Sequence, residues 1–97
     1  MNMNMLMQQA KKMQKDMENA KEEVSKMLFT SKQPLVEVTV NGDKVVTDIK
    51  INEEITSEDV EILQDMIMLA VNDAIKQANK AMEDKLGNFA SGIPGLF

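Results

Sequence analysis

The chain has 97 residues, a formal net charge of −5 at pH 7, and neither cysteine nor histidine. A chain of this length forms one domain with a small core. Without cysteine or histidine it cannot form a disulfide, and it lacks the usual ligands for zinc and the commonest nucleophiles and general bases of enzymes. We therefore expect no catalytic site, no metal and no cofactor.

The apolar residues do not form a run long enough to cross a bilayer. Residues 1–7 alternate methionine with asparagine and lack both the basic and the continuous apolar parts of a signal peptide. The sequence therefore predicts a cytoplasmic protein that binds neither a membrane nor a small-molecule substrate. Tryptophan and tyrosine are also missing, so an aromatic platform for stacking bases is not expected.

The first predicted element is a long helix over residues 3–28. Its apolar residues recur at alternating spacings of three and four, which is the a/d ladder of an amphipathic helix. Glycine and proline do not occur before Pro34. The ladder consists of Met3, Leu6, Ala10, Met13, Met17, Ala20, Val24 and Met27.

The middle of the chain predicts a β-hairpin over residues 35–51. Its first strand alternates, which places Val36, Val38 and Val40 on one face. The returning strand, residues 45–51, alternates as well. The residues expected on one side of it are Val45, Thr47, Ile49 and Ile51.

Asn41 and Gly42 predict the turn of this hairpin. Both residues tolerate the positive φ of a two-residue type I′ turn, so this pair is a strong hairpin signal. Residues around Phe29 can add a further short strand, which leaves a sheet of either two or three strands.

The last predicted element is a helix over residues 57–86, with Thr56 as its N-cap and Gly87 as its stop. Residues 87–97 are expected to form a flexible tail. Asn72 and Asp73 interrupt an apolar stretch of this helix, and either a buried hydrogen-bond network or a narrow exposed face accounts for them.

The same helix is apolar over too much of its circumference to be covered by one hairpin. A second copy of the chain can supply the missing cover, so we expect a homodimer with a shared core. The residues expected in this core are Ile62, Met66, Ile67, Leu69, Ala70, Val71 and Ala74.

These elements predict one α+β domain: a long helix, a small antiparallel sheet and a second long helix. Strands of six or seven residues span about 20 Å, roughly half the length of the first helix. We therefore expect the N-terminal half of the first helix and the C-terminal half of the last helix to overhang the sheet.

Charge is distributed unevenly along the chain. Residues 1–15 hold three lysines and no acid, whereas residues 33–66 hold two lysines and nine acids. Gln8, Lys11, Lys12 and Lys15 share one helix face, opposite the apolar ladder. The pattern alone is compatible with an ordinary solvated face or with a surface that contacts phosphates.

Several stretches together resemble the YbaB/EbfC family. They are the opening MQQAKKMQKDM at residues 7–17, the strand and turn LVEVTVNG at residues 35–42, EDVEIL at residues 58–63 with AVNDA at residues 70–74, and the ending GIPGLF at residues 92–97. The family usually carries a glycine-rich run where this chain has residues 30–34, and often an Asp-Pro pair where it has Thr56-Ser57.

The resemblance implies an α–β–α chain that joins a second copy in a tweezer-shaped homodimer. It further implies a bacterial, nucleoid-associated protein that binds duplex DNA, alters its conformation and acts in nucleoid organisation and gene regulation. The contacts would come from the protruding helices, with lysine favouring low sequence specificity. The implied DNA-binding residues are Gln8, Lys11, Lys12, Lys15, Lys76, Lys80 and Lys85.

The acidic net charge supports a rival interpretation. In it the chain is a protein–protein adaptor that acts with replication or recombination proteins and does not itself touch DNA.

Overall fold

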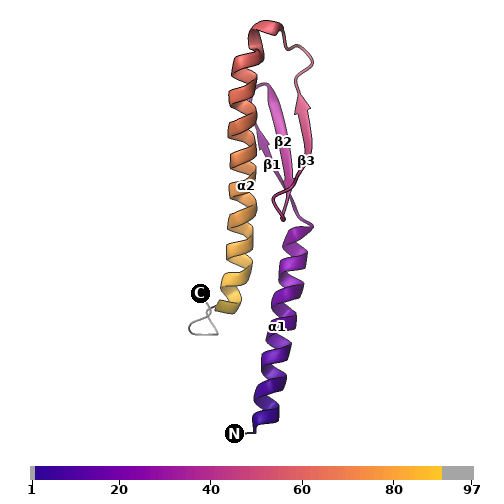
Figure 1. Cartoon of the computed structure of the whole chain (residues 1–97), viewed down its shortest axis with the longest axis vertical. Helices are drawn as coiled ribbons and strands as arrows, with labels where there is room; N and C mark the ends of the chain where they lie inside the picture. Colours follow the sequence, from indigo (N-terminus) through magenta and orange to yellow (C-terminus); the bar gives the residue numbers. More distant parts are fainter. Residues whose placement is uncertain (1, 91–97) are drawn as a thin grey trace.

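The structure is a computed structural model that describes residues 2–90 (Figure 1). It is elongated, 71 × 20 × 12 Å, and has the predicted α+β order of helix, antiparallel sheet and helix. Within the described residues, neither helix is long and apolar enough to cross a membrane. The elements are α1 (Met3–Ser25), β1 (Leu28–Lys32), β2 (Val36–Asn41), β3 (Val46–Ile51), the short 3₁₀ helix η1 (Ser57–Asp59) and α2 (Val60–Ala90).

The first helix ends earlier than predicted, at Ser25 rather than residue 28. The Met27 N–H donates to the Val24 carbonyl at 3.0 Å, which closes the turn, and the chain then enters β1. β1 pairs antiparallel with β2, with Phe29 opposite Val40, so the sheet has three strands in the order β1-β2-β3. Residues 28–32 gain their backbone hydrogen bonds from β2 instead of from a further helical turn.

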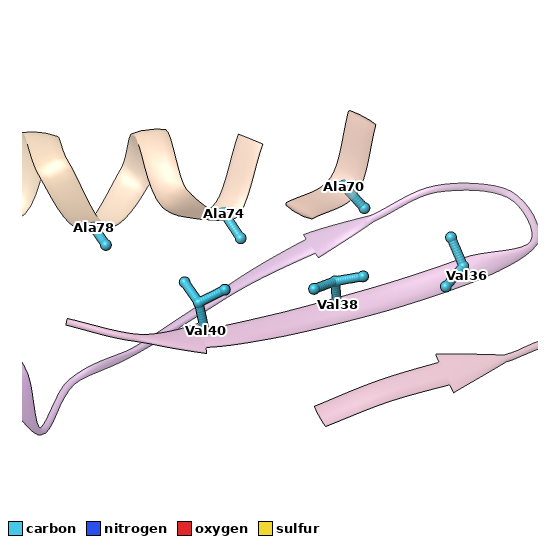
Figure 2. Close-up of a cluster of buried hydrophobic side chains, with 6 residues drawn as sticks. All are labelled: Val36, Val38, Val40, Ala70, Ala74 and Ala78. Carbon is cyan, nitrogen blue, oxygen red and sulfur yellow. The ribbon is translucent and has the colours of Figure 1, made fainter. Parts of the chain in front are cut away.

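α2 packs on the sheet through a row of alanines (Figure 2). Ala70, Ala74 and Ala78 face the predicted inner face of β2, and all of these side chains are buried. Because the alanine side chain is a single methyl group, the helix axis can lie close to the strand. The buried β2 residues are Val36, Val38 and Val40, and the flanking half-buried residues are Phe29, Leu63, Met66, Ile67, Val71 and Ile75.

The last helix begins as expected beside Thr56 but ends later than expected. The Thr56 backbone N–H donates to the Asp59 carboxylate at 2.9 Å, and η1 leads directly into α2. Gly87 does not stop the helix, which continues to Ala90. Glycine costs a helix interior only about 1 kcal/mol, too little to end it without a competing conformation. The prediction of a flexible tail is therefore wrong for residues 87–90, and residues 91–97 lie outside the described part.

The hairpin forms where Asn41-Gly42 predicted it, but its turn is longer than a two-residue type I′ turn. The Asn41 side-chain oxygen accepts from the backbone N–H groups of Asp43, at 2.9 Å, and Val45, at 3.1 Å. The positive φ, 66°, belongs to Lys44, whereas Gly42 lies outside the left-handed region. The Asn41 amide therefore holds the turn from within, and the type I′ prediction is wrong.

Gly42 is needed for a different reason, the close approach of α1. A Cβ atom at this position would lie 1.8 Å from the carbonyl oxygen of Val24. The end of α1 thus rests directly on the backbone of the hairpin turn, where no side chain fits between them.

β3 pairs with β2 through an irregularity next to Thr39 and Val40, which changes the predicted alternation. Val46, not Val45 or Thr47, shares a face with the following isoleucines, because residues opposite each other in a ladder share a face. α2 covers β1 and β2, so this row on β3 stays exposed. The opposed pairs are Val36 with Ile51, Val38 with Ile49, and Val40 with Val46.

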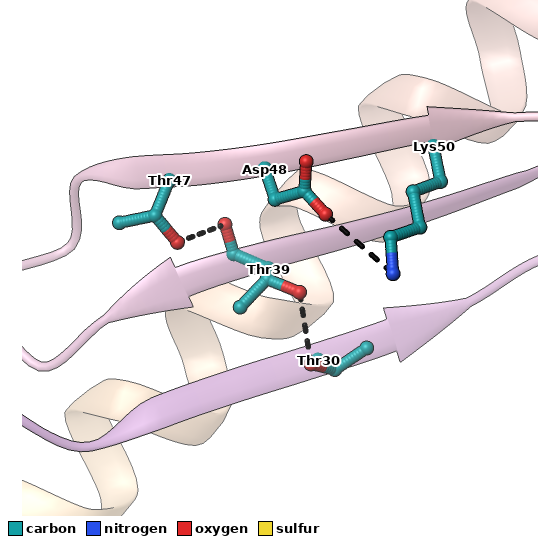
Figure 3. A network of polar contacts seen from close by, with 5 residues as sticks. All are labelled: Thr30, Thr39, Thr47, Asp48 and Lys50. Atoms are coloured by element: carbon teal, nitrogen blue, oxygen red, sulfur yellow. Dashed lines mark hydrogen bonds and ion pairs between the residues drawn. The ribbon is translucent and has the colours of Figure 1, made fainter.

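The other face of the sheet is polar (Figure 3). The hydroxyls of Thr30 and Thr39 lie 2.9 Å apart, and the Thr47 hydroxyl donates to the Thr39 carbonyl at 3.3 Å. Lys50 and Asp48 form an exposed ion pair at 3.9 Å. These contacts link all three strands on the side away from α2.

The two glycines in these contrasting positions give a stability test. We expect Gly42→Ala to lower the free energy of unfolding by about 2 kcal/mol, because overpacking against the Val24 backbone forces α1 to move. Gly87→Ala should raise it by about 0.5–1 kcal/mol, because nothing lies within 4 Å of the added methyl and alanine favours a helix. Urea unfolding followed by circular dichroism measures both, and equal effects of the two changes would contradict the close approach at residue 42.

Candidate nucleic-acid interface

The N-terminal part of α1 projects away from the rest of the described chain. Ala20 and Val24 are buried against α2, whereas Met13 and Met17 are half-buried and Leu6 is exposed. Figure 1 shows α1 running past the described end of α2. Among the described residues the apolar ladder is therefore covered only where α2 lies beside it, and the rest of α1 projects as an arm.

The predicted residues of α1 come together on this arm. Gln8, Lys11, Lys12 and Lys15 are all exposed, and their spacings place them on the face opposite the ladder. Within residues 2–90, the three lysines take part in no ion pair. The arm thus presents three adjacent ammonium groups to solvent.

The electrostatic surroundings of these lysines are favourable to an anion. The first acidic residue of the chain is Asp16, so the preceding part of the helix carries only positive charge. The Asn2 side chain caps the helix by accepting from the Asn4 N–H at 3.0 Å, and the first turn contains no acid. The positive end of the helix dipole lies at the tip of the same arm, and its effect is confined to the first turn.

The three predicted lysines of α2 are placed differently. Lys85 forms an ion pair with Glu23 of α1 at 3.1 Å, so its charge is partly neutralised and it joins the two helices. Lys76 and Lys80 are exposed on the shaft of α2, beside Asp73. The structure does not bring these lysines into the group on the arm.

Asp73 and its neighbour Asn72 are both exposed, which favours the second of the two interpretations of this pair. The Asp73 carboxylate accepts from Gln77 at 3.1 Å, and Gln77 also donates to the Thr30 carbonyl on β1 at 3.2 Å. This flank of α2 therefore faces the β1 edge of the sheet.

The residues expected in a shared dimer core divide into three groups. Ala70 and Ala74 are fully buried against the chain's own sheet, so they offer no surface to a second copy. Ile62 and Leu69 are exposed. The remaining three, Met66, Ile67 and Val71, are half-buried beside the alanine row.

The largest uncovered apolar row on the sheet was not among the predicted site residues. Val46, Ile49 and Ile51 on β3 are 40%, 44% and 48% exposed although they lie on the inner face of the sheet. Their alternation in an edge strand was visible in the sequence, but the sheet order and the path of α2 were needed to show that nothing covers them. Elsewhere in residues 2–90 no cluster of carboxylates forms a metal site.

Comparisons with known proteins agree on one family. Residues 1–93 match the model of the YbaB/EbfC DNA-binding family. A nucleoid-associated protein of Lactococcus lactis subsp. cremoris (strain MG1363) is 44% identical, over 97% of this chain and 98% of that protein. One of Acinetobacter baumannii (strain ATCC 17978) is 43% identical, over 99% of this chain and 96% of that protein.

The fold has a counterpart among solved structures. The crystal structure of an uncharacterized protein from Helicobacter pylori superimposes with a TM-score of 0.76 at 27% sequence identity. The match covers 91% of this chain and 96% of the Helicobacter chain.

Proposed function

This chain belongs to the YbaB/EbfC DNA-binding family, and on that premise we propose that it is a nucleoid-associated protein that binds duplex DNA as a homodimer. In this proposal it acts without catalysis, in the nucleoid, by altering the conformation of DNA, with consequences for nucleoid organisation and gene regulation.

The lysine face of α1 is the observation that carries the proposal. Lys11, Lys12 and Lys15 are exposed, form no ion pair within residues 2–90 and lie in a segment that has no acid before Asp16, apart from the acidic middle of the chain. A local cationic surface binds a polyanion even when the net charge of the protein is negative, because charges more than about 10 Å away are screened at 0.1 M salt. Lys76 and Lys80 are secondary contacts in this proposal, and Lys85 contributes least because it pairs with Glu23.

Low sequence specificity follows from the kind of cation. The chain has 11 lysines and arginines together, and every one of them is lysine. An ammonium group contacts phosphates as a point charge and lacks the planar fork that reads guanine in the major groove. Two copies of the lysine face supply up to about six phosphate contacts, for a salt slope near −5.

The uncovered row on β3 supports a homodimer. An edge strand presents unpaired backbone groups, and here it also presents Val46, Ile49 and Ile51 to solvent. The β1 edge is partly occupied by the hydrogen bond from Gln77 to Thr30. A second copy placed against β3 therefore buries the most apolar free edge of the sheet.

The lysine face gives the first test. We expect Lys11→Gln/Lys12→Gln/Lys15→Gln to abolish retention of a duplex in a gel shift at low salt, because the phosphate contacts are lost. The matched control, Lys32→Gln/Lys44→Gln/Lys50→Gln, removes the same charge from the sheet and its turn and should retain DNA.

Equal loss in both triple variants would show that overall charge, not this face, governs binding. If the unaltered protein fails to bind bare duplex even at low salt, the result favours the acidic protein–protein adaptor.

The β3 row gives the second test. We expect Ile49→Glu to convert the dimer to a monomer in sedimentation equilibrium, because a buried carboxylate in an apolar interface is strongly unfavourable. Its own fold should persist, since the side chain is exposed in the single chain. Leu28→Glu, on the opposite edge strand, should leave the dimer intact, and dissociation by Leu28→Glu alone would place the interface at β1.

A further inference from the structure

The N-terminal part of the apolar ladder is uncovered within residues 2–90. Met13 is half-buried, whereas Met3, Leu6 and Ala10 are exposed, Met3 by 75% and Leu6 by 44%. These four residues, the ladder strip, follow one another along one side of α1. An apolar strip is the side of a helix that packs against another segment. The ladder strip therefore has room for a further segment along its length.

The end of α2 lies beside the beginning of this strip. α1 and α2 run antiparallel (Figure 1), and the ion pair between Lys85 and Glu23 aligns them, with 3.1 Å between Nζ and Oε2. Ala90, where α2 ends, lies five residues beyond Lys85, or about 7.5 Å farther along the helix axis. That position is about level with Met17, so the chain leaves α2 immediately before the ladder strip.

Residues 91–97 match the strip in length. An extended segment rises about 3.3 Å per residue, so these seven residues span at most about 23 Å. The distance along α1 from Met17 to Met3 is about 21 Å, at about 1.5 Å per residue. An extended segment that starts at Ala90 can therefore cover the whole ladder strip.

The composition of residues 91–97 suits the same place. The segment, SGIPGLF, contains no charged side chain. Pro94 lacks a backbone N–H and disfavours a helical conformation of the residue before it, so an extended path is preferred to a longer α2. Its large apolar side chains are those of Ile93, Leu96 and Phe97. Burying them against methionine, leucine and alanine removes apolar surface of both partners from water.

We propose that residues 91–97 run along the ladder strip of their own chain, from Met17 toward Met3, and cover it. The segment then supports the arm on its apolar side. The opposite side, which carries Lys11, Lys12 and Lys15, stays free. This inference concerns the packing of the arm and does not require that the protein bind DNA.

The same chain is a better source of this cover than a second copy. Residue 91 follows Ala90 directly, so the segment starts next to the strip, and such a short connection gives an effective concentration in the millimolar range. The segment of another copy competes at the concentration of the free protein. A second α1 placed on the strip would meet residues 91–97 where they leave α2, and would have to displace them.

A pair of introduced cysteines tests the position of the segment. The chain has no cysteine of its own, so no other thiol interferes. On the proposed path Gly95 lies about 16 Å beyond Ala90, level with Leu6. The test protein is therefore Leu6→Cys/Gly95→Cys. The matched control is Gln8→Cys/Gly95→Cys, because Gln8 is exposed and lies about 160° around the helix from Leu6.

We expect the test pair to form a disulfide within one chain more than about tenfold faster than the control pair, because a segment docked on the strip reaches one side of the helix only. Counting free thiols against time gives the rate, which should not depend on protein concentration. A non-reducing gel shows whether the product is one chain or two. Equal rates for both pairs would contradict docking, and a covalent dimer as the main product would make a second copy the source of the segment. Either result overturns the inference.

A single tryptophan gives a second measurement that needs no covalent bond. The chain has no tryptophan or tyrosine, so Phe97→Trp is the only source of indole emission. We expect its emission maximum at a shorter wavelength than in the urea-unfolded protein, because the ring packs against the strip. Adding Leu6→Gln should move the maximum toward the unfolded value, whereas Met5→Gln, at an exposed methionine outside the ladder, should not. A folded Phe97→Trp protein that emits at the unfolded wavelength would contradict the inference.

Discussion

The structure depends on the contact between three alanines of α2 and three valines of β2. Ala70, Ala74 and Ala78 recur every fourth residue, so they form one straight row that lies along the strand. Because the helix sits directly over β2, it also covers β1 and leaves β3 uncovered. One row of small side chains thereby determines both the core of the chain and the edge that remains free for another molecule.

The packing of α2 on β2 also determines the position of the arm, the N-terminal part of α1. The long α2 continues past the sheet and contacts α1, of which Ala20 and Val24 are buried. The ion pair between Lys85 and Glu23 adds a second link between the helices. Exposed ion pairs contribute at most about 1 kcal/mol, so the apolar contact carries most of the attachment. Beyond this contact no other element within residues 2–90 supports α1, and the lysine face is exposed for this reason.

Local patterns predicted the secondary structure well, because each element has a periodicity of its own. The alternation of Val36, Val38 and Val40 identified a buried face, and Asn41-Gly42 identified a hairpin. The errors arose where a distant segment decides the outcome. Residues 26–28 leave the helix because β2 is there to pair with the next strand, and Gly42 owes its identity to Val24 rather than to its own φ. The Lys85–Glu23 pair was equally invisible, since no local pattern joins residues so far apart in sequence.

The backbone contact at Gly42 has a mechanical consequence. Met3 lies 21 residues from Val24, so the helix between them is a rigid lever about 30 Å long. The helix rests on the hairpin turn. If α1 tilts by about 10° at this contact, its N-terminal end moves by about 5 Å, nearly the width of a minor groove of DNA. A small change in the spacing between Val24 and residue 42 thus becomes a large displacement of the N-terminal end of α1. The absence of a side chain at Gly42 therefore determines the direction in which α1 projects.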